Sequence, residues 1–190
     1  MPAIEQDLKF IHIAAEELEN FLLSGEVFWT IDPIGTAKGK AYPSRLSVGQ
    51  ILLALARIKA YPLSADISTD YHRSADRIQQ IRSQWRATWD RKIGLEFPHR
   101  MRSWQQFWDE FSRDRRGAAF EYPIEVRIRT ILALLEAEAD SIPGADEARL
   151  GHFDQLLKSV FTLGEFIWDK TLVKSFPQPD FWFLYGTINP

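Results

Sequence analysis

The chain contains no cysteine among its 190 residues. Disulfide bonds, thiolate metal sites and cysteine nucleophiles are therefore excluded. No apolar run approaches the ~18 residues that a membrane-spanning helix needs, so we expect no membrane insertion. The first residues, MPAIEQDLKF, do not combine a basic segment with an apolar one. We therefore expect no signal peptide and a cytoplasmic location.

Motifs of the common enzyme classes are also missing. No serine stands in a Gly-x-Ser-x-Gly motif, and there is no kinase or dinucleotide-binding fingerprint. The segment GTAKGK resembles a phosphate-binding loop, but three residues rather than four separate Gly35 from Gly39. Ala41 stands where a serine or threonine would bind magnesium. The sequence gives no positive sign of an enzyme, and we expect no cofactor.

The composition is that of a folded protein, with 45% hydrophobic and 26% charged residues. A chain of this length buries roughly 70% of the surface that the unfolded chain exposes, so it needs no covalent staples. We expect a single domain over residues 1–190.

Apolar residues recur at spacings of three and four through most of the chain, which predicts helices. The predicted helices cover residues 3–24, 44–60, 68–92, 100–113, 123–140 and 145–170. The third and fourth fold back on each other at a turn over 94–98, and Pro123 occupies the first turn of the fifth. The predicted fold is an all-α, up-down helical bundle of five to six helices.

Two segments fall outside this helical pattern. Residues 26–43 form a long predicted loop, because prolines and glycines interrupt it repeatedly. The aromatic C-terminal tail, SFPQPDFWFLYGTINP, is broken by Pro177 and Pro179. Its apolar side chains either pack back over the bundle or form a patch that binds a partner.

The net charge of −3 hides a segregation of charge along the chain. Residues 38–129 carry a formal charge of +8 and the flanking residues −11. Such a basic middle is typical of an anion-binding face, or of basic central helices that pack beside acidic terminal ones. The candidate anion-binding residues are Arg73, Arg77, Arg82, Arg86, Arg113, Arg115 and Arg116.

Four aromatic residues share one face of the predicted fourth helix. They are Trp104, Phe107, Trp108 and Phe111. This face is a candidate homodimer interface, although the same spacing is typical of core packing. Interleaved arginines and tryptophans also suit nucleic-acid binding. An overall isoelectric point near 5.8 argues against that alternative.

Three histidines are candidate metal ligands: His12, His72 and His152. His12 and His72 each precede a carboxylate by one helical turn, so two such pairs are able to seed a metal site if the helices bring them together. None of the three points to the predicted core, where metal sites of helical bundles are built. We therefore favour no metal site.

The segment LSVGQILLAL resembles the second-helix signature of DinB-like (YfiT-like) four-helix bundles, Trp-Ser-x-x-Glu-x-x-x-His-Leu. Ser47 and Leu55 match this signature. Three positions depart from it, with Leu46 for the tryptophan, Gln50 for the glutamate and Ala54 for the metal-binding histidine.

The segment GHFDQLL around His152 is similar to the histidine-rich part of the last helix in the same family. Ala148 stands where the companion ligand would be. The resemblance implies an up-down bundle that has lost the metal centre used by relatives for thiol-dependent transfer chemistry.

We expect a non-enzymatic binding or interaction protein, with the aromatic face of the fourth helix as its candidate homodimer interface. The first alternative is a DinB-like metal-dependent enzyme with a rearranged site built from His12, His72 or His152. The second is a nucleic-acid-binding protein that uses the central arginines.

Overall fold

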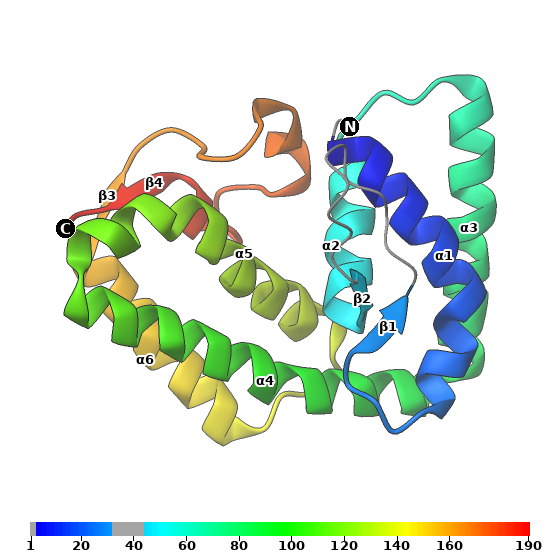
Figure 1. The fold of residues 1–190 in the computed structure, drawn as a ribbon, viewed down its shortest axis with the longest axis horizontal. Coiled ribbons are helices and arrows are strands. Elements are labelled where there is room, and N and C mark those ends of the chain that lie inside the picture. Colours follow the sequence, from blue (N-terminus) through cyan, green and yellow to red (C-terminus); the bar gives the residue numbers. More distant parts are fainter. Residues whose placement is uncertain (1–2, 32–43) are drawn as a thin grey trace. The chain divides into compact units, whose positions relative to one another are not determined.

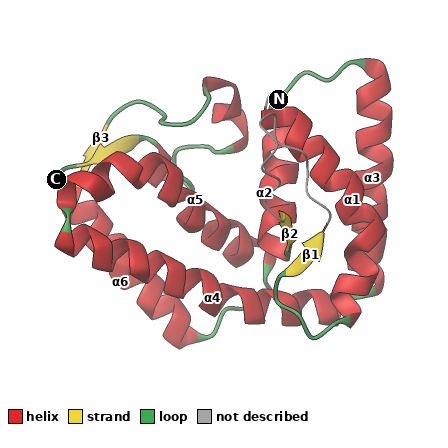
Figure 2. Cartoon of the chain, in the orientation of Figure 1, coloured by secondary structure: helices red, strands yellow, loops and turns green. Residues whose placement is uncertain are grey.

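The computed structural model describes residues 3–31 and 44–190 of the chain (Figure 1). Helices make up most of these residues and the strands are short (Figure 2), which confirms the predicted all-α class. The chain divides into two compact units, residues 1–96 and 97–190, and each is described by itself. The prediction of a single domain remains a prediction. Most of the predicted 26–43 loop lies outside the described residues.

Unit 1 is built on three helices, a small sheet and the beginning of a fourth helix. The elements are α1 (Ala3–Leu23), β1 (Trp29–Ile31), β2 (Ser44–Leu46), α2 (Val48–Ile58), α3 (Ala65–Gln84) and the first part of α4 (Arg86–Arg113). Helix α1 packs against both α2 and α3 (Figure 1). Its apolar stripe supplies the core, since Ile11, Leu18 and Leu22 are at most 1% exposed.

The predicted start of the second helix at residue 44 is wrong. Residues 44–46 instead pair antiparallel with β1, with Trp29 opposite Leu46. Ser47 then caps α2, because its side chain accepts a hydrogen bond from the backbone N–H of Gln50.

The predicted turn over 94–98 is also wrong, because α4 runs through it with Pro98 inside the helix. The chain breaks earlier, at Trp85, whose backbone leaves the helical region (φ −112°, ψ 34°). One apolar stripe continues through the proline: Trp89, Ile93, Phe97, Met101 and Trp104 are each at most 1% exposed. Burying each such side chain stabilises by about 1.5–3 kcal/mol, which together exceeds the roughly 3 kcal/mol cost of an interior proline.

Unit 2 combines the second part of α4 with two further helices and a packed C-terminal tail. The later elements are α5 (Arg115–Glu138), α6 (Gly144–Val160), β3 (Phe161–Leu163), the 3-10 helices η1 (Lys170–Ser175) and η2 (Trp182–Leu184), and β4 (Gly186–Ile188).

The predicted bounds of the last two helices need correction. Helix α5 begins before residue 123, because Asp114 caps it through a 3.0 Å hydrogen bond from the N–H of Gly117. Pro123 therefore lies inside α5. Helix α6 ends at Val160 rather than at 170, because residues 161–163 pair antiparallel with β4.

The C-terminal tail packs back on unit 2, which was the first of the two alternatives. Phe176, Phe183 and Leu184 are fully buried. The hydroxyl of Tyr122 on α5 donates a 2.6 Å hydrogen bond to the carbonyl oxygen of Phe183. The tail thus completes the core of unit 2.

Candidate functional site

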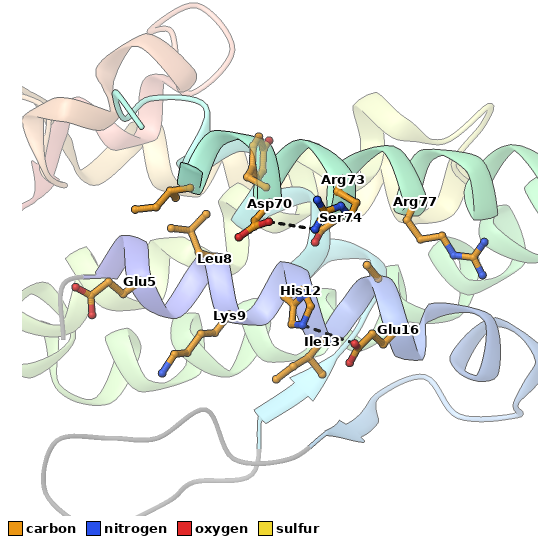
Figure 3. A pocket seen from close by; sticks show the side chains of 13 residues that line it. Glu5, Leu8, Lys9, His12, Ile13, Glu16, Asp70, Arg73, Ser74 and Arg77 are labelled. Atoms are coloured by element: carbon orange, nitrogen blue, oxygen red, sulfur yellow. Dashed lines mark hydrogen bonds and ion pairs between the residues drawn. The ribbon is translucent and has the colours of Figure 1, made fainter. Parts of the chain in front are cut away.

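A groove of about 1150 Å³ runs between α1 and α3 in unit 1 (Figure 3). The α1 residues that line it are Glu5, Leu8, Lys9, His12, Ile13, Ala15 and Glu16, and the α3 residues are Ile67, Asp70, Tyr71, Arg73, Ser74 and Arg77. Glu5 and Leu8 lie at one end of the groove, and Glu16 and Arg77 lie at the other.

The floor of the groove is largely apolar. Ala15 from α1 and Tyr71 and Ser74 from α3 are each 8% exposed. Ile67, one turn before Tyr71, is 45% exposed and extends the apolar surface toward solvent. Spacings of three and four place these residues on facing sides of the two helices. A ligand with an apolar face can therefore bury further surface here.

The rim of the groove carries charges of both signs. Arg73 pairs with Asp70 at 3.1 Å, and Nε2 of His12 lies 3.6 Å from a carboxylate oxygen of Glu16. These two pairs, drawn as dashed lines in Figure 3, are largely exposed and so contribute little stability. The lining residues include three acidic side chains and three basic ones besides His12, so the rim is close to neutral.

Two hydroxyl groups stand among the apolar side chains. Burial raises the pKa of Tyr71 above its ordinary value. Its hydroxyl is therefore protonated at neutral pH and can donate a hydrogen bond. With Ser74 it offers a ligand polar contacts at the floor, where water is partly excluded.

The three candidate metal ligands belong to different surroundings. His12 lies in the groove with Glu16, His72 is exposed on α3 with its ring 5.3 Å from that of Tyr71, and His152 belongs to unit 2. Within residues 3–31 and 44–190, no group of three or more histidine or acidic side chains is arranged to hold a metal ion.

The arginine candidates divide between the two units. Arg73 and Arg77 share the groove, and Arg77 also lies 3.9 Å from Glu19. Arg82 donates to Gln79 at 3.0 Å, and Arg86 donates to Asp90 at 2.8 Å.

The remaining arginine candidates, Arg113, Arg115 and Arg116, belong to unit 2. Arg115 stacks 5.6 Å above the ring of Phe111. The structure therefore brings only Arg73 and Arg77 of the arginine candidates into the groove.

The candidate dimer face is buried within the chain. Trp104 is fully buried and Phe107, Trp108 and Phe111 are at most 7% exposed. The rings of Trp104 and Phe107 stack on each other at 4.9 Å. These side chains form core contacts within the chain and leave little surface for a second copy. The oligomeric state itself is not tested by the structure, and the homodimer remains a prediction.

Sequence reasoning missed most of the groove. Ile67 lay just outside the predicted third helix, and Tyr71 and Ser74 were not singled out. Their spacing of three and four, continued to Ile78, was the available signal. Most of the residues between them are polar or charged, so the apolar stripe of this helix is narrow and weak in the sequence.

Comparison of the chain with protein-family models, characterised proteins and solved structures gave no match. The resemblance to DinB-like bundles is therefore neither supported nor contradicted. Across residues 3–31 and 44–190, none of the helices combines the length and the apolar character of a membrane span.

Proposed function

We propose that this chain is a non-enzymatic interaction protein that binds an amphipathic helical segment of a partner protein in the α1–α3 groove. The observation that carries the proposal is the groove itself, which has an apolar floor and a rim of mixed charge between two parallel helices.

The dimensions of the groove suit a short helix. The stretch of α1 from Glu5 to Glu16 covers about 16 Å at 1.5 Å per residue, so a partner helix of about three turns has the same length. Such a helix presents apolar side chains at spacings of three and four, which is the usual pattern of helix-in-groove recognition. Ile67 and Leu8 line the groove and are placed to contact them.

The charges of the rim favour a protein partner over a nucleic acid. Lys9 and Arg73 are offset by Glu5 and Asp70 along the same groove. A phosphate backbone requires a surface with a clear excess of positive charge. A peptide whose apolar stripe is flanked by side chains of both signs is complementary to this rim.

The test begins with a photo-crosslinking amino acid at Ile67 in the full chain. The crosslinked partner segment is sequenced, synthesised as a peptide and titrated by calorimetry against the unmodified protein and an Ile67→Glu variant. We expect the substitution to weaken binding at least tenfold, because a charge placed against an apolar face costs roughly 1.4 kcal/mol or more.

Leu163→Glu is the matched control, because Leu163 is 66% exposed but lies in unit 2. We expect this variant to bind the peptide as the unmodified protein does. Equal affinity of the Ile67→Glu variant, or crosslinking only to nucleic acid, contradicts the proposal. A crosslink to a second copy of the chain would contradict a separate partner protein and indicate self-association through the groove, not through the aromatic face of α4.

A further inference from the structure

A second cleft lies in unit 2, between α4 and α6, and its volume is about 590 Å³. None of its lining residues belongs to the α1–α3 groove. Helix α4 contributes Gln105, Trp108 and Asp109, and α6 contributes Arg149, His152 and Phe153. The cleft is within the size range of small-molecule sites.

The floor of this cleft is aromatic. Trp108, Phe111 and Phe153 line it and are at most 7% exposed. The rings of Trp108 and Phe111 meet edge to face at 5.5 Å, which fixes their orientation. Leu156 is 37% exposed and adds an aliphatic surface. A flat, apolar ligand therefore finds a matching surface.

The polar groups of the cleft favour an anion. Its lining residues include two arginines, Arg115 and Arg149, and a single carboxylate, Asp109, so the formal charge is positive even with His152 neutral. The guanidinium of Arg115 lies over the Phe111 ring at 5.6 Å, and Arg149 on α6 donates to the side-chain oxygen of Gln105 on α4. Both cations are thus held beside the aromatic floor.

One polar group in the cleft wall has an unmet hydrogen bond. The indole Nε1 of Trp108 is buried and has no partner among the described residues. The missing hydrogen bond costs free energy, and because the atom is buried, a ligand in the cleft does not reach it without a rearrangement of the wall. The hydroxyl of Ser112 is not available as a donor in the same way, because it donates to the carbonyl oxygen of Trp108 at 2.9 Å.

We infer that this cleft binds a small aromatic carboxylate, with its ring against Trp108, Phe111 and Phe153 and its carboxylate paired with an arginine of the rim, Arg115 or Arg149. Binding involves no covalent step. The inference goes beyond the proposed function, since it concerns a different unit and a different class of ligand.

The probes are 1-naphthoate and its uncharged counterpart 1-naphthamide, titrated by calorimetry into the full chain. We expect naphthoate to bind with a Kd of about 1 mM or tighter. Charge-assisted hydrogen bonds are about twice as strong as neutral ones, so the amide should bind roughly tenfold more weakly.

Three variants locate the site. The double variant Arg115→Gln with Arg149→Gln should weaken naphthoate binding roughly tenfold or more and abolish its advantage over the amide. Trp108→Phe keeps an aromatic floor but reduces its area, and it should weaken the binding of both probes to a similar extent. Arg91→Gln, at an exposed position outside both the groove and the cleft, is the control and should leave naphthoate binding unchanged. Circular dichroism confirms that each variant is folded.

Equal affinity for acid and amide, unchanged binding by the double arginine variant, or no binding of naphthoate at about 10 mM overturns the inference. Titration of naphthoate into the Ile67→Glu variant separates the cleft proposal from the groove proposal. If it is retained when that variant loses the partner peptide, the cleft and the groove are independent sites.

Discussion

Lys92 and Glu96 stand one turn apart on α4 and bind the ends of two other helices of unit 1. Nζ of Lys92 donates to the carbonyl oxygens of Ser24 and Glu26, at 3.0 and 2.5 Å, just beyond the end of α1. The Glu96 carboxylate accepts from the Ser47 hydroxyl at 2.8 Å and from the N–H of Gly49 at 2.9 Å, at the start of α2. Both side chains are 1% exposed.

Each charge has the sign that its helix end favours. Carbonyl groups at a helix C-terminus attract a cation, and N–H groups at an N-terminus attract an anion. Lys92 also lies 4.3 Å from the centre of the Phe21 ring. Its pKa is lowered by burial first and by the charge of Arg91 second, whereas Glu26 acts in the opposite direction. The pair thus anchors both ends of the connection between α1 and α2.

Lys92→Met should destabilise the protein by about 1–3 kcal/mol, because the carbonyl groups that follow α1 lose a charged donor. The measurement is the free energy of unfolding from urea denaturation. Arg91→Met is the control, because Arg91 is the exposed neighbour on the same helix. Equal losses in the two variants would show that Lys92 contributes no more than a surface residue.

Gly94→Ala should stabilise the protein by about 1 kcal/mol, because an alanine is favoured over glycine inside a helix. A Cβ at this position meets no atom within 4 Å, so no clash opposes the gain. Gly186→Ala is the opposite case, because Gly186 has φ +157° and a Cβ there overlaps the carbonyl oxygen of Thr162.

Thermal unfolding of the two glycine variants compares them directly. We expect a higher Tm for Gly94→Ala and a lower Tm for Gly186→Ala. Loss of stability in Gly94→Ala would instead support the turn that the sequence predicted at residues 94–98.

Asp154→Asn should destabilise the protein by roughly 3–5 kcal/mol, because it leaves the guanidinium of Arg129 buried without its counter-charge. Arg129 and Asp154 form two 2.7 Å hydrogen bonds, and the Arg129 side chain is only 7% exposed. Asp180→Asn, at an exposed position, is the control for the charge change.

The double variant Arg129→Met with Asp154→Leu tests the cause of that loss. It should unfold closer to the unmodified protein than Asp154→Asn does, because it removes both charges together. If it is the less stable of the two, the ion pair contributes a net stabilisation and the stranded charge is not the main cost.

Stability should fall above pH 10 because of Tyr122. Burial raises its pKa above the ordinary value of 10.0. The unfolded chain therefore releases the phenol proton near pH 10 while the folded chain retains it, so unfolding is increasingly favoured as pH rises. The loss approaches about 1.4 kcal/mol per pH unit above 10. Below pH 10 the folded and the unfolded chain both hold the phenol proton, so Tyr122 contributes its full stabilisation.

Urea denaturation at pH 7, 9 and 11 measures this dependence against Tyr122→Phe. The variant should be the less stable at pH 7, because it loses the 2.6 Å hydrogen bond to Phe183. The difference between the two proteins should shrink at pH 11, because on unfolding the unmodified protein ionises one more tyrosine, Tyr122, than the variant does. If the difference in unfolding free energy between the two proteins stays constant across the three pH values, the pKa of Tyr122 is not raised in the folded chain.

Local patterns in the sequence determined the helical class and α1 almost to the residue. These features depend on residues within a few positions of each other, so the spacing of apolar side chains suffices to predict them.

Tertiary structure alone decided that α4 passes through Pro98, that residues 161–163 leave the last helix, and that Ile67, Tyr71 and Ser74 share a groove with α1. Helix α1 lies far from α3 in the sequence, and β4 lies far from β3. Pro98 is offset by the burial of side chains on both sides of it along α4. Local propensity amounts to a few kcal/mol per element, and burial against distant residues outweighs it. The sequence specified which segments become helices, and packing decided where they end and which faces meet.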